Sequence, residues 1–137
     1  MYLIDTNVIS ALRRPEQAPE SLIEWASSAS EGDLYVSAIT LYEIDIGIRR
    51  LERRDPAQAE GLRGWFDRRV VSGFRERILP VDHAVSIRAA ALQVPDPMPE
   101  ADGFIAATAL VHRLTLVTRN VRNFARTGVK IVNPWNS

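Results

Sequence analysis

The chain has 137 residues, of which 46% are hydrophobic and 25% charged, and its formal net charge is zero. This length suits a single domain, residues 1–137, with a core of its own. The absence of cysteine excludes disulfides, thiolate zinc sites and cysteine nucleophiles. The apolar runs are too short to span a bilayer, and the N-terminus lacks the basic start of a signal peptide. We therefore expect a cytoplasmic protein with no membrane contact.

Charge is distributed unevenly along the chain. Residues 103–137 hold four arginines, one lysine and no acid, whereas residues 1–48 hold eight acids against two arginines. Almost all of the basic residues are arginine, which binds phosphate through a planar fork of donors. The pattern indicates either a phosphate-bearing partner or the arginine preference of a GC-rich coding sequence.

Short apolar runs alternate with helical stripes along the whole chain. The runs predict strands at residues 2–5, 34–36, 78–81, 116–118 and 129–132. The stripes predict helices at residues 7–13, 19–29, 38–54, 57–75, 83–93 and 100–113. This alternation predicts an α/β protein in which a short parallel sheet of about four to five strands is flanked by helices.

Polar residues follow two of the predicted strands, at the edge of the sheet where ligands of such folds bind. The first strand ends on Asp5, which is followed by Thr6 and Asn7. The strand over residues 116–118 is followed by Arg119 and Asn120. We therefore expect a functional site at this edge.

Two predicted helices each add a carboxylate near the same edge. Glu43 lies in the second turn of the helix from residue 38, and Asp102 lies in the first turn of the helix after Pro99. Converging carboxylates repel one another, and a divalent cation such as Mg²⁺, which prefers oxygen ligands, resolves this most simply. Taken singly, each acid also has an ordinary interpretation: Asp5 as a turn residue, Asp102 as a partner of the helix dipole, and Glu43 as a solvated helix residue.

Four segments of the chain carry a family resemblance: YLIDTNVIS at the start, SAITLYEIDIG at 37–47, PEADGFIAATAL at 99–110 and LTLVTRNVRNF at 114–124. In this order and spacing they resemble the PIN-domain family, and within it the VapC-type toxins of type II toxin–antitoxin pairs. The resemblance implies a PIN-like fold and a Mg²⁺-dependent or Mn²⁺-dependent endoribonuclease. It also implies RNA as substrate, a small antitoxin protein as inhibitor, and a homodimer.

The resemblance further implies roles for particular residues. The three acids Asp5, Glu43 and Asp102 match the catalytic, metal-holding residues of the family. Side chains that orient these ligands or the substrate would be Thr6, Asn7, Thr118, Asn120 and Asn123. The family's fourth acid is an amide at both candidate positions, Asn120 and Asn123, which leaves three acids and predicts one well-bound cation.

Two surfaces are expected around this site. Carboxylates repel RNA, so arginines close to the site are candidates for phosphate contacts, namely Arg119, Arg122 and Arg126. The dimer is expected to use large apolar residues beside the arginines of the helix over 57–75, namely Leu62, Trp65, Phe66 and Val70. The alternative is that Trp65 and Phe66 cover the chain's own core.

Three other functions fit part of the pattern. A phosphatase of the haloacid dehalogenase type also begins with an aspartate after the first strand, but it needs a second aspartate where Asn7 stands. A phosphorelay receiver needs a lysine late in the sheet, whereas the single lysine, Lys130, lies in the last predicted strand. A degenerate PIN domain that binds RNA or protein without cleavage is the main alternative, because Asn120 and Asn123 replace an acid.

Overall fold

The computed structural model describes residues 1–136, so Ser137, the last residue of the predicted domain, lies outside the described part. Within these residues, five parallel strands form a sheet in the order β3-β2-β1-β4-β5. The strands are β1 Tyr2–Ile4, β2 Leu34–Ser37, β3 Ile78–Leu79, β4 Thr115–Val117 and β5 Ile131–Val132. The α/β class and the short parallel sheet predicted from the sequence are confirmed.

The central strand β1 pairs with β2, which comes next in the chain, and with β4, which comes much later. Tyr2 is in register with Leu34 of β2, and Ile4 is in register with Val117 of β4. Parallel strands in register end at the same edge, so the residues that follow β1 and β4 become neighbours. The backbone amide of Asp5 accordingly donates to the carbonyl oxygen of Val117 at 2.9 Å.

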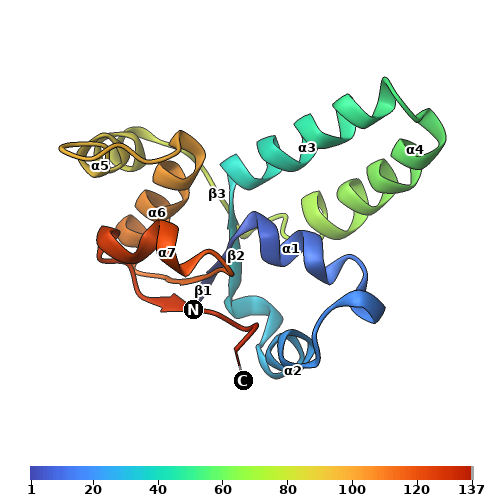
Figure 1. Cartoon of the computed structure of the whole chain (residues 1–137), viewed down its shortest axis with the longest axis horizontal. Coiled ribbons are helices and arrows are strands. Elements are labelled where there is room, and N and C mark those ends of the chain that lie inside the picture. Colours follow the sequence, from blue (N-terminus) through green and yellow to red (C-terminus); the bar gives the residue numbers. More distant parts are fainter. Residues whose placement is uncertain (137) are drawn as a thin grey trace.

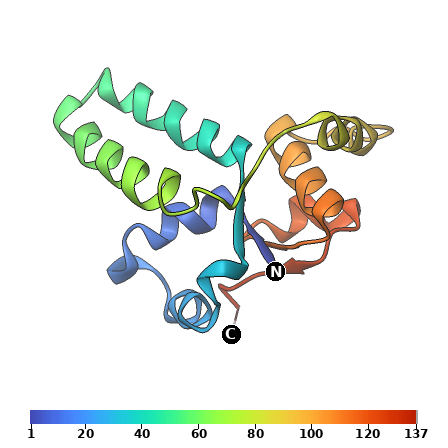
Figure 2. The same cartoon turned by 180° about the vertical axis from the view of Figure 1, so that it is seen from behind.

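Helices cover both faces of the sheet (Figure 1). Those of the N-terminal half are α1 Thr6–Leu12, α2 Glu20–Ser28, α3 Ala38–Glu52 and α4 Pro56–Trp65, with the short helical segments η1 Pro15–Gln17, η2 Glu31–Asp33 and η3 Phe66–Val71. Those of the C-terminal half are α5 His83–Leu92, α6 Glu100–His112 and α7 Val121–Phe124, with η4 Ala125–Thr127. Figure 2 shows the same division from behind, with the α3–α4 pair on one side of the sheet and the α5–α6 pair on the other.

Successive residues of the central strands point to opposite faces, as the pleat requires. Ile4 and Val117 pack into one core with α1, α2, α3 and η3. Leu3 and Leu116 pack into a second core with α6 and α7. The two cores hold the helices against the sheet from both sides and fix the places where α3 and α6 begin.

The single helix expected over residues 57–75 is two elements in the structure. After α4, the segment η3 winds as a π-helix, and the amide of Ser72 donates to the carbonyl oxygen of Asp67, five residues earlier. Phe66 and Val70 are buried in this segment, with 5% and 1% of their surface exposed. The prediction of a single α-helix is therefore wrong at this point, because the chain changes from α-helical to π-helical winding where Phe66 and Val70 enter the core.

The apolar residues expected to form a dimer interface all pack with the chain's own core. Phe66 and Val70 belong to the core beneath α1 and α3, and the partly buried Leu62 and Trp65 pack against it. The alternative that Trp65 and Phe66 cover the chain's own core is therefore confirmed, and the homodimer itself stays a prediction.

The remaining predicted elements agree with the structure to within about two residues at each end. The short elements α7 and η4 were not expected, although α7 buries Phe124 in the core beside α6. No helix in the part of the chain that is described here is long and apolar enough to cross a bilayer.

Candidate active site

Asp5 is the first residue after β1 and caps the N-terminus of α1. Its extended backbone, with φ −72° and ψ 156°, lets Oδ1 accept a hydrogen bond of 2.8 Å from the amide of Thr6. Oδ2 accepts from the hydroxyl of Thr118 at 2.7 Å and from the side-chain amide of Asn7 at 3.1 Å. With 4% of its surface exposed, Asp5 is a buried carboxylate held by three donors.

Thr118, the first residue after β4, joins the two strand ends. Its buried hydroxyl donates to Asp5 and accepts from the backbone amide of Asn120 at 3.0 Å. The side chain of Asn7 spans the same gap, because its oxygen accepts from the backbone amide of Arg119 at 3.2 Å. The polar residues predicted at these two strand ends therefore form one hydrogen-bonded network.

Glu43 enters the site from α3, which Ser37 caps by accepting from the amide of Ile39 at 3.1 Å. The hydroxyl of Thr6 lies 2.7 Å from Oε1 of Glu43 and 3.1 Å from the hydroxyl of Thr40. Thr6 thus connects the residue after β1 to the second turn of α3. Thr40 is a site residue that sequence reasoning did not assign, although it stands one helical turn before Glu43 on the same stripe.

Asp102 lies in the first turn of α6 and has a different partner. The side-chain amide of Asn123, from α7, donates to Oδ2 of Asp102 at 3.3 Å. Of the two asparagines at the family's fourth acidic position, Asn123 is therefore the one in contact with an acid. Asn120 is exposed and joins the network through its backbone amide.

Two of the three acids act electrostatically on the third, Asp5. Burial raises the pKa of Asp5, hydrogen bonds from Thr118 and from the amide of Thr6 oppose that rise, and the charges of Asp102 and Glu43 add to it. Burial also raises the pKa of Asp102, against the opposing hydrogen bond from Asn123. The structure thus places two carboxylates close enough to Asp5 to disfavour its negative charge.

The donor chemistry of these acids fits a hard divalent cation. Carboxylates supply only oxygen, which Mg²⁺ and Mn²⁺ accept, and a positive charge would relieve the repulsion at Asp5. Among residues 1–136, no three histidine, aspartate or glutamate side chains form a ready-made metal-binding group. Mg²⁺ keeps several waters and takes one or two carboxylates directly, so the set suits a cation held partly through water.

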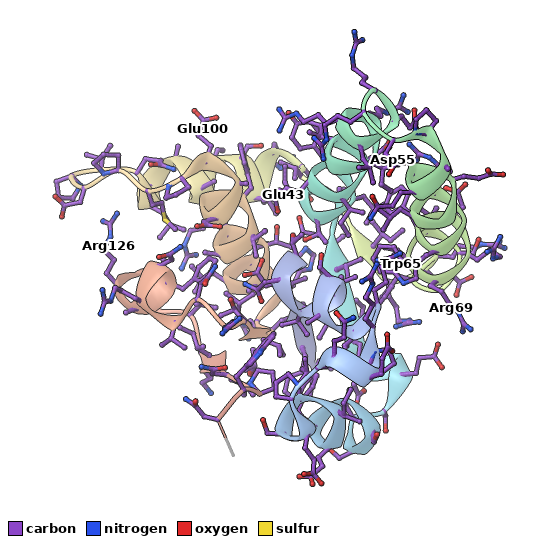
Figure 3. All side chains as sticks on the ribbon, turned by 45° about the vertical axis from the view of Figure 1, so that its right-hand side comes forward. Glu43, Asp55, Trp65, Arg69, Glu100 and Arg126 are labelled. Atoms are coloured by element: carbon purple, nitrogen blue, oxygen red, sulfur yellow. The ribbon has the colours of Figure 1, made fainter. Side chains whose placement is uncertain are left out.

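The three arginines expected near the site have different surroundings. Arg119 lies over the ring of Trp135, with its guanidinium carbon 5.4 Å from the ring centre. Arg122 is exposed on α7. Arg126 donates through Nη2 to the backbone carbonyls of Asp96 and Pro97, so its guanidinium already has protein partners (Figure 3).

One cavity adjoins the site, and a second shares lining residues with the first; the sequence predicted neither. One, of about 360 Å³, begins at Thr6 and Glu43 and is lined further by Ser10, Arg13, Ile44, Gly47, Ile48, Leu62 and Trp65. The other, of about 380 Å³, is mostly apolar and also includes Arg13 and Trp65 in its lining. We call the two together the Trp65 groove, after the residue at the end of α4 that lines both (Figure 3).

Comparison with known proteins places this arrangement in a family. The PIN domain family model matches residues 2–130. Toxin FitB of Neisseria gonorrhoeae is 37% identical over 99% of both chains, and VapC ribonuclease Y4jK of Sinorhizobium fredii is 32% identical over 98% of both. The crystal structure of FitAcB from Neisseria gonorrhoeae aligns over 100% of both chains with a TM-score of 0.88 and 36% identity. The chain therefore belongs to the PIN domain family and is a relative of its VapC-type toxins.

Proposed function

We propose that this chain is the toxin of a toxin–antitoxin pair and an endoribonuclease that hydrolyses phosphodiester bonds of RNA. Its relatives include proteins named as a toxin and as a ribonuclease. The observation that carries the proposal is the buried Asp5 at the carboxyl edge of the sheet, which Thr6 links by hydrogen bonds to Glu43 and on which the charge of Asp102 also acts. A buried carboxylate with two acidic neighbours is costly for stability and is typical of a catalytic centre.

Asp5, Glu43 and Asp102 are the residues that would hold Mg²⁺ or Mn²⁺. Such a cation supplies a water of lowered pKa and neutralises charge on the phosphoryl oxygens. The chain's own contribution is to orient the carboxylates before the cation binds. Thr118 and the amide of Thr6 orient Asp5, and the hydroxyl of Thr6 orients Glu43.

RNA must approach this acidic site against repulsion. Arg119 and Arg122 lie in the segment that directly follows β4, so they are the candidates to draw phosphates toward Asp5. The segment from residue 103 onward carries five basic residues and no acid, which favours RNA on that side. An RNA substrate inside the cell also implies that the protein acts in the cytoplasm.

The Trp65 groove is the surface that we assign to the inhibitory antitoxin. It combines an apolar lining with the arginines Arg13 and Arg69, and it opens at Glu43. A segment of a partner protein with apolar side chains would bury these surfaces and cover Glu43 from the groove. An antitoxin segment in the Trp65 groove would then inhibit the chain, because RNA could no longer reach the carboxylates.

A homodimer also belongs to this proposal, through a face different from the one that the sequence suggested. Ile87 and Val94, at α5 and just beyond it, are 71% and 75% exposed. Between α5 and α6 lies a cavity of about 550 Å³ whose lining includes Met98 and Phe104. Exposed apolar residues beside an apolar hollow suit a second copy of the chain.

The proposal is tested by expressing the chain alone and sequencing the newly formed ends of cellular RNA. We expect discrete ends at defined positions, and we expect these ends to be absent when Asp5→Asn is expressed at the same level. If both proteins bind RNA and neither produces new ends, the chain is the degenerate PIN domain that binds without cleavage.

A further inference from the structure

The loop between α5 and α6 is held from two sides. On the side of α5, the side-chain oxygen of Gln93 accepts from the amide of Met98 at 2.8 Å. Gly103, in the first turn of α6, packs so closely that a Cβ there would lie 3.0 Å from Nε2 of Gln93. The loop comprises residues 93–99, and the start of α6 packs directly against its first residue, Gln93.

On its other side, the loop is held by Arg126 from η4. Nη2 of Arg126 donates to the carbonyl oxygens of Asp96 and Pro97, the latter at 3.1 Å, and Nη1 lies 3.9 Å from Oδ2 of Asp96. Figure 3 shows Arg126 extending from the α7–η4 segment toward this loop. Hydrogen bonds from a guanidinium to carbonyl oxygens are charge-assisted and therefore stronger than neutral ones.

The loop is stiff enough to pass this restraint to α6. Pro95, Pro97 and Pro99 each fix one backbone angle, and α6 begins at Glu100, directly after the last of them. Asp102 follows within the first turn. A shift of the loop would therefore displace the carboxylate of Asp102 along with the helix start.

The segment α7–η4 contacts this unit at two points. Asn123 donates to Asp102, and Arg126, three residues later, donates to the loop in front of it. We infer that Arg126 is a positioning residue, which holds the loop of residues 93–99 so that Asp102 remains against Asn123 and beside Asp5. This inference rests on the proposed function for its catalytic meaning, and it assigns Arg126 a role other than the phosphate contact expected from the sequence.

The restraint itself is tested by hydrogen exchange on the metal-free protein without RNA. We expect Arg126→Met to speed amide exchange over residues 93–103 by about tenfold, as the loss of charge-assisted hydrogen bonds implies, and Arg126→Lys to speed it less. Arg122→Met is the matched control, since Arg122 is exposed on the neighbouring turn, and it should leave exchange in this segment unchanged. Unchanged exchange in Arg126→Met overturns the inference, whether or not the chain cleaves RNA.

Calorimetric titration with Mn²⁺ connects the restraint to the site. Loss of a positive charge near a cation site should by itself tighten Mn²⁺ binding. A displaced Asp102 has the opposite effect, so we expect Arg126→Met to weaken Mn²⁺ binding several-fold and Arg122→Met not to weaken it. Tighter or unchanged binding in Arg126→Met overturns the positioning role.

Salt dependence of RNA binding separates the positioning role from a phosphate contact. The measurement uses single-stranded RNA and variants in an Asp5→Asn background, so that the RNA stays intact. Each phosphate contact that is lost lowers the slope of log affinity against log salt by about 0.7. We expect an unchanged slope for Arg126→Met, and a slope reduced by about that amount contradicts the inference.

Discussion

The hydroxyl of Thr118 donates a hydrogen bond of 2.7 Å to Oδ2 of Asp5, and so ties together the ends of β4 and β1. Both side chains are buried, and they stand far apart in the sequence. Thr118 therefore fixes the orientation of the Asp5 carboxylate within the folded chain itself. Burial and the charges of Asp102 and Glu43 nevertheless raise the pKa of Asp5 above its ordinary value of 3.8.

This raised pKa predicts how stability depends on pH in metal-free buffer. Between pH 3.8 and the raised pKa, the folded state binds a proton at Asp5 that the unfolded chain has released. The contribution of Asp5 to the free energy of unfolding therefore falls as pH rises through this range and stays low above it. Asp5→Asn lacks this titration, so its Tm relative to the wild type should increase between pH 4 and pH 8.

Thermal denaturation with EDTA present, followed by circular dichroism, checks this prediction. The matched control is Glu60→Gln on the exposed side of α4, which makes the same acid-to-amide change away from the site. If the Tm difference between Asp5→Asn and the wild type does not vary with pH, the pKa of Asp5 is not raised in the folded protein.

The two asparagines at the fourth acidic position should respond differently to substitution. Asn123 contacts Asp102, so Asn123→Asp adds a fourth carboxylate to the site; it should tighten Mn²⁺ binding and lower the Tm of the metal-free protein. Asn120 is exposed and uses its backbone amide, so Asn120→Asp should change neither quantity much. Calorimetry and thermal denaturation measure both effects, and the reverse ranking of the two variants would refute this assignment.

The sequence was sufficient to predict the strand ends of the site, because an apolar run that stops on Asp5 and a β-branched run that ends at Thr118 mark the same edge of a parallel sheet. Glu43 and Asp102 were predictable for a similar reason, since each lies near the start of a predicted helix. The partners of these acids were not predictable. Whether Asn120 or Asn123 faces an acid depends on α7, which is too short to leave a periodic pattern in the sequence.

Long-range packing accounts for what the sequence could not show. The change to a π-helix at Phe66 leaves the spacing of buried residues close to that of an α-helix, so periodicity does not reveal it. The same limit applies to the predicted dimer interface, because large apolar residues beside arginines are found both in interfaces and at the edge of a core. The structure places Phe66 and Val70 in the core, because η3 packs in one cluster with Ile4 and Val36.

The Trp65 groove predicts a variant that separates inhibition from cleavage. A Cβ at Gly47 would meet nothing within 4 Å, so Gly47→Leu fits the helix while its side chain projects into the groove one turn after Glu43. We expect binding of the cognate antitoxin to weaken by at least about tenfold, because a filled groove cannot accept a partner side chain.

Gly61→Leu on α4 is the control for this variant, since a Cβ there also meets open space but lies outside both cavities. Both changes replace a helical glycine and should raise the Tm slightly, so unfolding would not explain a loss of binding. Isothermal titration with the antitoxin measures the difference, and equal affinity of the two variants would exclude the groove as its binding site.

The two candidate dimer faces can be compared by one charge substitution in each. Ile87→Arg places a charge on the exposed side of α5, and Val71→Arg places one at the end of η3. We expect sedimentation at micromolar concentration to show a dimer for the wild type and for Val71→Arg, and a monomer for Ile87→Arg. A wild-type protein that sediments as a single 15.4 kDa species would reject the dimer altogether.

The central claim is that Asp5, with Glu43 and Asp102, forms a cation-dependent centre that cuts RNA, and cleavage of a labelled RNA by the purified chain tests it most directly. We predict cleavage with Mg²⁺ or Mn²⁺, and none with EDTA or with Ca²⁺ alone. We expect Asp5→Asn to lower the cleavage rate at least about a hundredfold, because mutating residues that merely hold a metal ligand in place already lowers activity by about 10-fold to 100-fold. Full cleavage in EDTA, or cleavage by Asp5→Asn at the wild-type rate, would contradict this account.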